Sequence, residues 1–266
     1  MYTINQYVKA VSLEEAYELN QKKANLIFGG TLWLRLGNRT INTAIDLSAL
    51  GLDKIEERED AFVIGCMTSL RELELCQGLE ALTRGAIRES LQHIVGTQFR
   101  NCATVGGSIF GRFGFSDILT CLLVLDTTVD LYKGGRVPLA EFVKMPRDND
   151  ILTHIIIKKT KRQAVYQAFR TAATDFPVLT CAVSRGEDGI RTAIGARPNK
   201  AVLFCDEENY LQGEISPAKL EAYAAYIQEH TSFGTNMRGS AAYRKALAGI
   251  LVKRALQAAL REENDL

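Results

Sequence analysis

The sequence has 266 residues, 47% hydrophobic and 24% charged, so it is long enough to bury a sizeable core in one large or two small domains. Its 32 basic and 31 acidic residues leave a net charge of +1, which argues against nucleic acid or an anionic membrane as a partner. No apolar run approaches the roughly 20 residues that a membrane span needs, and we expect no signal peptide.

The cysteines are scattered along the chain, and none lies in a CxxC arrangement. Iron–sulfur and zinc sites need closely spaced thiolates, so we expect this chain to carry neither. Buried, reduced thiols and a cytoplasmic location are the simplest interpretation. The cysteines stand at positions 66, 76, 102, 121, 181 and 205.

The N-terminal stretch predicts a small βαβ-like unit. A capping box at Ser12–Glu15 opens a helix that ends before Leu26. An apolar strand at 26–28 then leads into the glycine pair Gly29-Gly30, and leucines follow at helical spacing. Another strand covers 44–47, and the charged residues 51–60 form a connector.

A second unit begins with a strand at 61–65 and a capping box formed by Ser69 and Glu72. A helix predicted over 81–94 delivers the chain to a short apolar strand that ends in Gly106 and Gly107. After an irregular loop, a helix opens at Ser116. The remaining predictions are strands at 128–132 and 151–158, a short helix at 139–143, antiparallel strands at 166–171, 178–184 and 190–195, and helices at 217–228 and 241–262.

The two glycine pairs are the strongest functional signal. A glycine pair lets the backbone approach a ligand closely, and the N–H groups of the turn can point at an anion. Two such turns predict a cradle that closes on a diphosphate from both sides. Neither matches the GxGxxG pattern of a dinucleotide fold, and no histidine has the neighbours of a hydrolytic triad.

Several motifs resemble those of a known family. These are GGT at Gly29–Thr31, RNCATVGGSI at Arg100–Ile109, Ser116-Asp117, and a late MRGSAAYR that starts at Met237. In this order they resemble the FAD-binding subunit of the molybdenum hydroxylases, which include xanthine dehydrogenase and carbon monoxide dehydrogenase. The resemblance covers nearly the whole chain. It implies an α+β fold with a bipartite FAD-binding domain over 1–160 and a smaller C-terminal antiparallel sheet-plus-helices domain over 161–266, the first divided into subdomains at 1–55 and 56–160.

The resemblance also assigns residues to FAD. The backbone of each glycine turn would contact the diphosphate, with threonine hydroxyls adding hydrogen bonds. The first loop comprises Leu26, Ile27, Phe28, Gly29, Gly30, Thr31 and Leu32, and the second comprises Thr104, Gly106, Gly107, Ser108 and Gly111.

Other residues are expected around the ribityl chain and the flavin ring. Asp117 would accept hydrogen bonds from ribose or ribityl hydroxyls, or it would simply favour the helix dipole beside the N-cap Ser116. The resemblance places Ile151 and Leu152 as apolar contacts of the ring and Arg170 as a cation near it. A positive charge there stabilises reduced flavin. For Arg170 alone, a surface salt bridge is the competing interpretation.

The chain departs from the family pattern in two places. Ser108 stands where asparagine is common, and Arg112-Phe113-Gly114 replaces a run of small residues and proline. Serine can still donate a hydrogen bond to phosphate, and Arg112 could pair with the diphosphate. These departures put in doubt the course of the loop, the affinity for flavin and the choice of electron acceptor.

The resemblance implies an electron-transfer subunit with no catalytic residues of its own. Electrons would arrive from a 2Fe-2S subunit, substrate would be oxidised on a molybdenum-cofactor subunit, and FAD here would reduce NAD⁺ or another acceptor. One alternative is a free-standing FAD-dependent oxidoreductase of the related fold. The other is an assembly subunit that has lost its flavin, which Ser108 and Arg112 would favour.

Overall fold

The computed structural model describes residues 2–261. Its fold is α+β, as predicted, and it divides into two compact units. Unit 1 comprises the residues up to Leu73 together with Gly96–Gly111 and Thr127–Lys158. Unit 2 comprises Glu74–Val95, Arg112–Asp126 and the residues from Lys159 onward. The chain therefore passes between the units several times.

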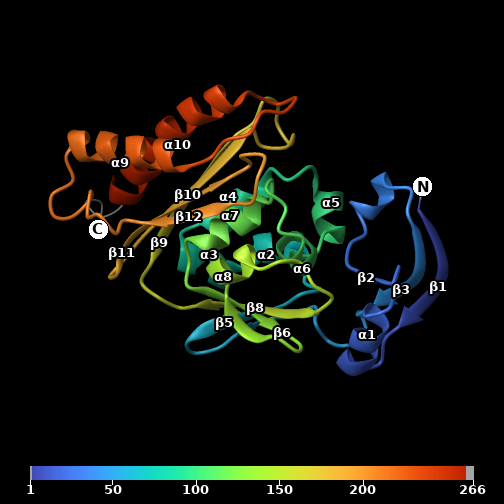
Figure 1. The fold of residues 1–266 in the computed structure, drawn as a ribbon. Helices are drawn as coiled ribbons and strands as arrows, with labels where there is room; N and C mark the ends of the chain where they lie inside the picture. Colours follow the sequence, from blue (N-terminus) through green and yellow to red (C-terminus); the bar gives the residue numbers. More distant parts are fainter. Residues whose placement is uncertain (1, 262–266) are drawn as a thin grey trace. The chain divides into compact units, whose positions relative to one another are not determined.

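Unit 1 contains two sheets (Figure 1). The first is parallel, with strand order β1-β3-β2, and α1 packs on it, so the predicted βαβ arrangement is confirmed. The second is antiparallel, with order β4-β5-β8-β6-β7. The elements that begin in unit 1 are β1 Thr3–Lys9, α1 Leu13–Asn20, β2 Leu26–Phe28, the 3-10 helix η1 Leu34–Leu36, β3 Thr40–Asp46, β4 Ile55–Glu57, β5 Ala61–Gly65, α2 Leu70–Leu75, α5 Thr97–Cys102, α6 Val105–Phe110, β6 Thr127–Leu131, β7 Gly135–Pro138, α8 Leu139–Lys144 and β8 Leu152–Lys158.

Unit 2 is built on an antiparallel sheet of order β12-β11-β10-β9 with helices on both faces. Alternate residues of β10 divide between these faces. Cys181 and Val183 join the core formed with α9 and α10, whereas Thr180 contacts Thr120 of α7. The elements are α3 Gln77–Thr83, α4 Ala86–Gln92, α7 Asp117–Leu123, β9 Gln163–Phe169, β10 Leu179–Gly186, β11 Gly189–Gly195, β12 Val202–Cys205, α9 Pro217–His230 and α10 Ala241–Arg261.

Several predicted elements were wrong. Gly106 and Gly107 do not follow a strand but lie within α6, whose N-cap is Thr104. The helix predicted over 81–94 is two helices, because Arg84 and Gly85 have φ of 48° and 83°. The helical spacing after Gly30 yields only η1. The connector at 51–60 contains the edge strand β4, and β12 was not predicted. The last predicted helical residue, Glu262, lies outside the described residues.

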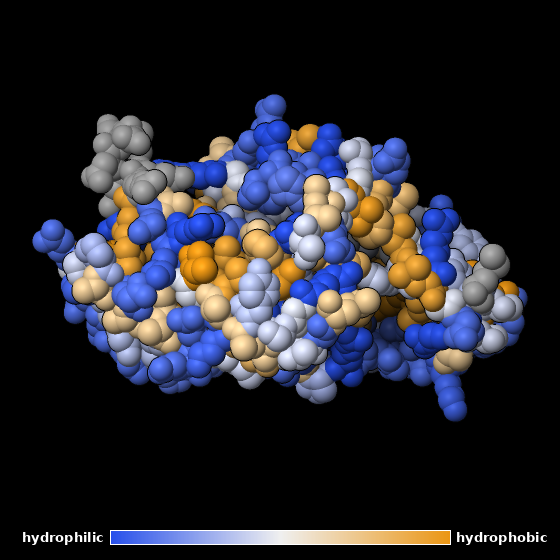
Figure 2. Space-filling model, turned by 90° about the horizontal axis from the view of Figure 1, so that it is seen from above, coloured by the Kyte–Doolittle hydropathy of each residue, from blue (hydrophilic) through white to orange (hydrophobic). Residues whose placement is uncertain are grey.

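Within residues 2–261, no helix is long and apolar enough to cross a bilayer. The face shown in Figure 2 is a mosaic of hydrophilic and hydrophobic residues.

Candidate functional site

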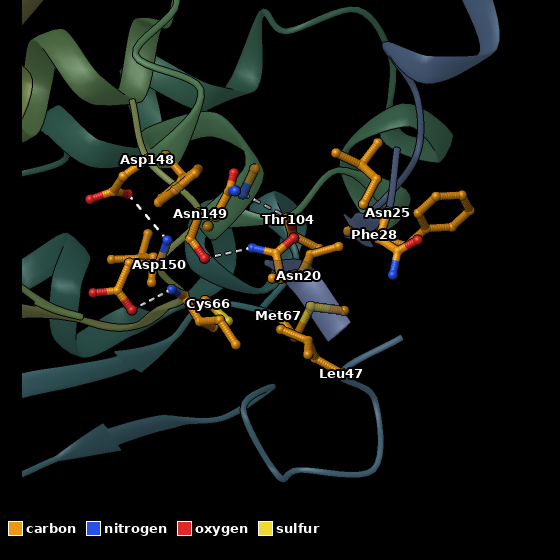
Figure 3. Close-up of a pocket in the computed structure, with 18 of the residues that line it drawn as sticks. Asn20, Asn25, Phe28, Leu47, Cys66, Met67, Thr104, Asp148, Asn149 and Asp150 are labelled. Carbon is orange, nitrogen blue, oxygen red and sulfur yellow. Dashed lines mark hydrogen bonds between the residues drawn. The ribbon is translucent and has the colours of Figure 1, made fainter. Parts of the chain in front are cut away.

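A cavity of about 440 Å³ in unit 1 brings together much of the predicted site. In Figure 3, Asn25 and Phe28 lie on one side of it, Asp148–Asp150 lie on the other, and Thr104 lies between them. The predicted residues that line it are Leu26, Ile27, Phe28, Gly29, Thr104, Gly106, Gly107, Ile151 and Leu152. Residues that are more than 120 positions apart in the sequence therefore share one site.

Each glycine pair contains one residue that the packing requires. A Cβ on Gly30 would lie 1.9 Å from the carbonyl oxygen of Cys102, and one on Gly106 would lie 2.6 Å from the carbonyl oxygen of Cys66. A real Cβ cannot approach a backbone oxygen so closely, so only glycine fits at either position. The first glycine turn is thereby pressed against the backbone that leads into the second.

The other glycine of each pair lies beside the Thr104 hydroxyl. A Cβ on Gly29 would lie 2.6 Å from Thr104 Oγ1, and one on Gly107 would lie 3.1 Å from it. Thr104 Oγ1 also accepts a hydrogen bond from the Gly107 N–H at 3.2 Å, which caps α6. Thr104 thus joins both glycine pairs at the wall of the cavity.

The residue after the first pair has an unusual backbone conformation. Thr31 has φ of 58°, in the left-handed region that β-branched residues rarely adopt. Such strain is typical of ligand-binding turns, because the surrounding structure must hold it in place. Its carbonyl accepts a hydrogen bond from the Arg35 N–H, which ties Thr31 to η1.

The cavity also has a cationic rim that the sequence did not single out. Lys22, Lys23 and Arg39 line it, and within residues 2–261 none of their side chains makes an ion pair or hydrogen bond. By contrast, the carboxylate of Asp150 accepts hydrogen bonds from backbone N–H groups, including that of Gly134 at 2.7 Å. Asp148 accepts one from the Asp150 N–H. The site therefore offers unpaired positive charge and glycine backbone, which suits an anionic ligand such as a diphosphate.

Polar contacts hold the walls together. Asn20 Nδ2 donates to the carbonyl oxygen of Asn149 at 2.8 Å (Figure 3). Gln21 Nε2 donates to the same oxygen at 2.9 Å, so the end of α1 is tied to the loop before β8. Cys66 lines the floor, and burial raises the pKa of its thiol to about 12. A signal for part of this wall was present in the sequence, since the basic pair Lys22-Lys23 lies shortly before β2.

Some predicted residues do not line the cavity. In unit 1 these are Gly30, Thr31, Leu32, Ser108 and Gly111. The Ser108 hydroxyl donates to the Thr104 carbonyl at 3.0 Å, and the Gly111 carbonyl accepts from the Arg147 guanidinium. Arg112, a predicted phosphate partner, belongs to unit 2, where it is only 2% exposed.

The remaining predicted residues belong to unit 2. Ser116 caps α7 by accepting from the Leu119 N–H, as predicted. Asp117 Oδ1 accepts hydrogen bonds from Arg170 Nη2 and Tyr166 Oη, both at 2.5 Å. The Arg170 and Asp117 side chains are 10% and 6% exposed, so their ion pair is buried rather than superficial. Burial raises the pKa of Asp117, and the Arg170 guanidinium opposes this shift.

Comparison with known proteins identifies the class. Residues 2–160 match the FAD binding domain in molybdopterin dehydrogenase, and residues 164–259 match the CO dehydrogenase flavoprotein C-terminal domain. The chain therefore belongs to the family of FAD-binding medium subunits of molybdenum hydroxylases, and its cofactor is FAD.

Relatives match nearly the whole chain. YgfM of Escherichia coli strain K12 is 31% identical over 255 residues, which cover 94% of each protein. The medium subunit of nicotine 6-hydroxylase from Paenarthrobacter nicotinovorans is 26% identical over 277 residues, covering 94% of this chain and 95% of that protein. A chain of carbon monoxide dehydrogenase from Hydrogenophaga pseudoflava shares the fold with a TM-score of 0.85 at 23% identity, covering 96% of this chain and 97% of that one.

Proposed function

We propose that this chain is the electron-transfer subunit of a cytoplasmic molybdenum hydroxylase. It receives electrons from a 2Fe-2S subunit, substrate is oxidised on a molybdenum-cofactor subunit, and NAD⁺ or another acceptor is reduced at this chain. When bound, FAD supplies the two-electron chemistry that links these steps. In this proposal residues 1–160 form the FAD-binding domain and residues 161–266 form the C-terminal domain.

The observation that carries the proposal is the cavity in unit 1. Its backbone cradle needs glycine at Gly30 and Gly106, and its rim carries unpaired cations. In the proposed binding mode, Gly29 presents its backbone N–H group to the diphosphate, Gly107 lets the diphosphate approach because it has no side chain, and Lys23 and Arg39 offset its charge. Leu152 supplies apolar surface.

The first experiment tests binding. We expect the purified chain to carry FAD, detected by its visible spectrum, and the flavin-free chain to take up added FAD. Lys23→Met and Arg39→Met should each weaken binding about threefold in low salt, with less effect in high salt because exposed charges are screened. Lys144→Met is the matched control, since Lys144 is exposed in α8 and does not line the cavity.

The outcomes separate the proposal from its alternatives. A colourless chain that rejects added FAD would indicate an assembly subunit. Turnover of small oxidisable substrates by the chain alone would indicate a free-standing oxidoreductase. Bleaching of the bound flavin by NADH under nitrogen supports NAD⁺ as the acceptor, whereas an unchanged spectrum would exclude it. Co-purification with molybdenum and 2Fe-2S subunits is expected when all three are co-expressed.

A further inference from the structure

The two sides of the cavity in unit 1 are built on different sheets. On one side, Asn20, Lys22 and Lys23 lie between α1 and β2, and α1 packs on the parallel sheet. On the other side, residues 148–152 lead into β8 of the antiparallel sheet. The width of the cavity therefore depends on the contacts that join these two parts of unit 1.

The residues that follow β6 hold the second of these walls through their backbone. The Tyr132 N–H donates to the Ile151 carbonyl at 2.9 Å, and the Lys133 N–H donates to Asp150 Oδ1 at 3.1 Å. The Gly134 N–H donates to Asp150 Oδ2 at 2.7 Å. Asp150 is buried, so these hydrogen bonds are shielded from water. Tyr132 and Lys133 are thus fixed to the wall.

The side chains of the same two residues contact α1 on the opposite wall. The centroids of the Tyr17 and Tyr132 rings lie 5.6 Å apart. Lys133 Nζ lies 5.3 Å from the centre of the Tyr17 ring and 4.6 Å from the centre of the Tyr132 ring. An ammonium group beside two aromatic rings is attracted to both. Tyr17, Tyr132 and Lys133 therefore form a clasp between α1 and the end of β6.

Two amides place the end of α1 directly on the second wall. Asn20 Nδ2 donates to the Asn149 carbonyl at 2.8 Å (Figure 3). Gln21 Nε2 donates to the same oxygen at 2.9 Å and to the Tyr17 carbonyl at 3.2 Å. Tyr17 and Gln21 are four residues apart and so share one side of the helix. The clasp and the amides therefore act on the same end of α1.

We propose that the clasp sets the distance between the two cavity walls, and that Lys133 is the positioning residue that holds the two tyrosine rings together. Its effect on FAD rests on the proposed function. Lys133 does not line the cavity, so it acts through Tyr17 and Asp150 and not by touching the cofactor. A site whose walls are held in place before binding loses less conformational freedom on binding, so it binds its ligand more tightly.

The first readout is hydrogen exchange in the full chain before FAD is added. Tyr17→Leu should speed exchange of the 132–134 and 150–151 amides about fivefold, because the wall opens locally when the clasp is lost. Lys133→Met should have a smaller effect in the same direction. Tyr17→Phe keeps the ring and should exchange like the unmodified chain. Ser12→Ala is the matched control, since it weakens α1 at the other end of the helix.

The second readout is the affinity for FAD, measured as a double-mutant cycle. We expect Tyr17→Leu to lower affinity about fivefold and Lys133→Met about threefold, because a less ordered site binds less tightly. The double variant should bind about as weakly as Tyr17→Leu alone, since each change opens the same clasp. Lys133→Arg keeps the cation and should retain most of the affinity. Lys144→Met removes an exposed lysine of α8 and is the control for lost charge.

Two outcomes would overturn the proposal. One is unchanged exchange of these amides in both Tyr17→Leu and Lys133→Met. The other is a loss of affinity in the double variant equal to the product of the single losses, since Lys133 would then act on FAD only through its charge.

The remaining outcomes are also decided. If Tyr17→Leu does not fold, the comparison of Lys133→Met with Lys133→Arg and Lys144→Met tests the clasp by the same two readouts. Equal losses of affinity in Lys133→Met and Lys144→Met would again reject it. A chain that takes up no FAD would instead refute the proposed function, and exchange would still show whether the clasp orders the wall.

Discussion

The two glycine pairs look alike in sequence but differ in structure. Gly29-Gly30 lies in a turn after β2, whereas Gly106-Gly107 lies inside α6. What they share is their surroundings. In each pair one glycine is pressed against a cysteine carbonyl, and the other lies beside the Thr104 hydroxyl. A glycine pair here indicates a close approach of backbone segments rather than one local conformation.

The four glycines therefore have two different roles. Gly30 and Gly106 let the walls of the cavity meet, so replacing them is expected to damage the fold. Gly29 and Gly107 line the cavity, as Gly106 also does, but they are not pressed against a backbone carbonyl, and replacing Gly107 is expected to damage binding more than folding.

The largest effect is expected from Gly30→Ala. Its Cβ would lie 1.9 Å from the Cys102 carbonyl oxygen, and backbone cannot move aside as a flexible side chain can. We expect a loss of more than about 3 kcal/mol in the free energy of unfolding, above the usual cost of overpacking. Urea denaturation measures this loss in the free energy of unfolding, and the soluble yield of the variant is recorded beside it. Gly37→Ala is the control, because its Cβ would meet no atom closer than 3.4 Å, and an equal loss there would contradict the explanation.

The cysteines behind the two packing glycines should differ sharply in reactivity. Burial raises the pKa of the Cys66 thiol from 9.0 to about 12, whereas Cys102 is exposed. At a pH below both the ordinary and the raised pKa, this shift lowers the thiolate fraction of Cys66 about a thousandfold, since each pKa unit is a factor of ten. At pH 8, iodoacetamide should label Cys102 and spare Cys66, as peptide mapping would show. Gly106→Ala should expose Cys66 to the reagent, and continued protection would mean that the wall had relaxed without opening.

Much of this arrangement could be predicted from the sequence. Local signals placed the caps Ser12, Ser69 and Ser116 and the strand before Gly29, because they depend on neighbours within a few residues. The conformation of Gly106 could not be predicted, because the apolar residues around it suit a buried strand and a buried helix equally. The partners of Asp117 were also missed, since Tyr166 of β9 and Arg170, which directly follows β9, lie far along the chain.

Gly107→Ala is expected to separate binding from folding. In α6 the greater helix propensity of alanine offsets the crowding of Thr104 Oγ1, so the free energy of unfolding should change by less than about 1 kcal/mol. FAD affinity should nevertheless fall at least tenfold, because the added methyl group faces the proposed diphosphate. Fluorescence titration of the flavin-free chain measures the affinity. Unchanged affinity would remove the second glycine pair from the binding site.

The smallest effect is expected at Thr104, where the two glycine pairs meet. Thr104→Val keeps the shape but removes the acceptor of the Gly107 N–H, so loss of the cap should cost about 1 kcal/mol. FAD affinity should fall by a few fold, because the second turn is less well ordered, and Thr104→Ser should restore most of it. Ser12→Ala is the matched control, since Ser12 caps α1 in the same unit and does not line the cavity. Equal losses of FAD affinity in Thr104→Val and Ser12→Ala would mean that Thr104 contributes only stability. In that case the Thr104 hydroxyl that both glycine pairs share would have no effect on the ligand.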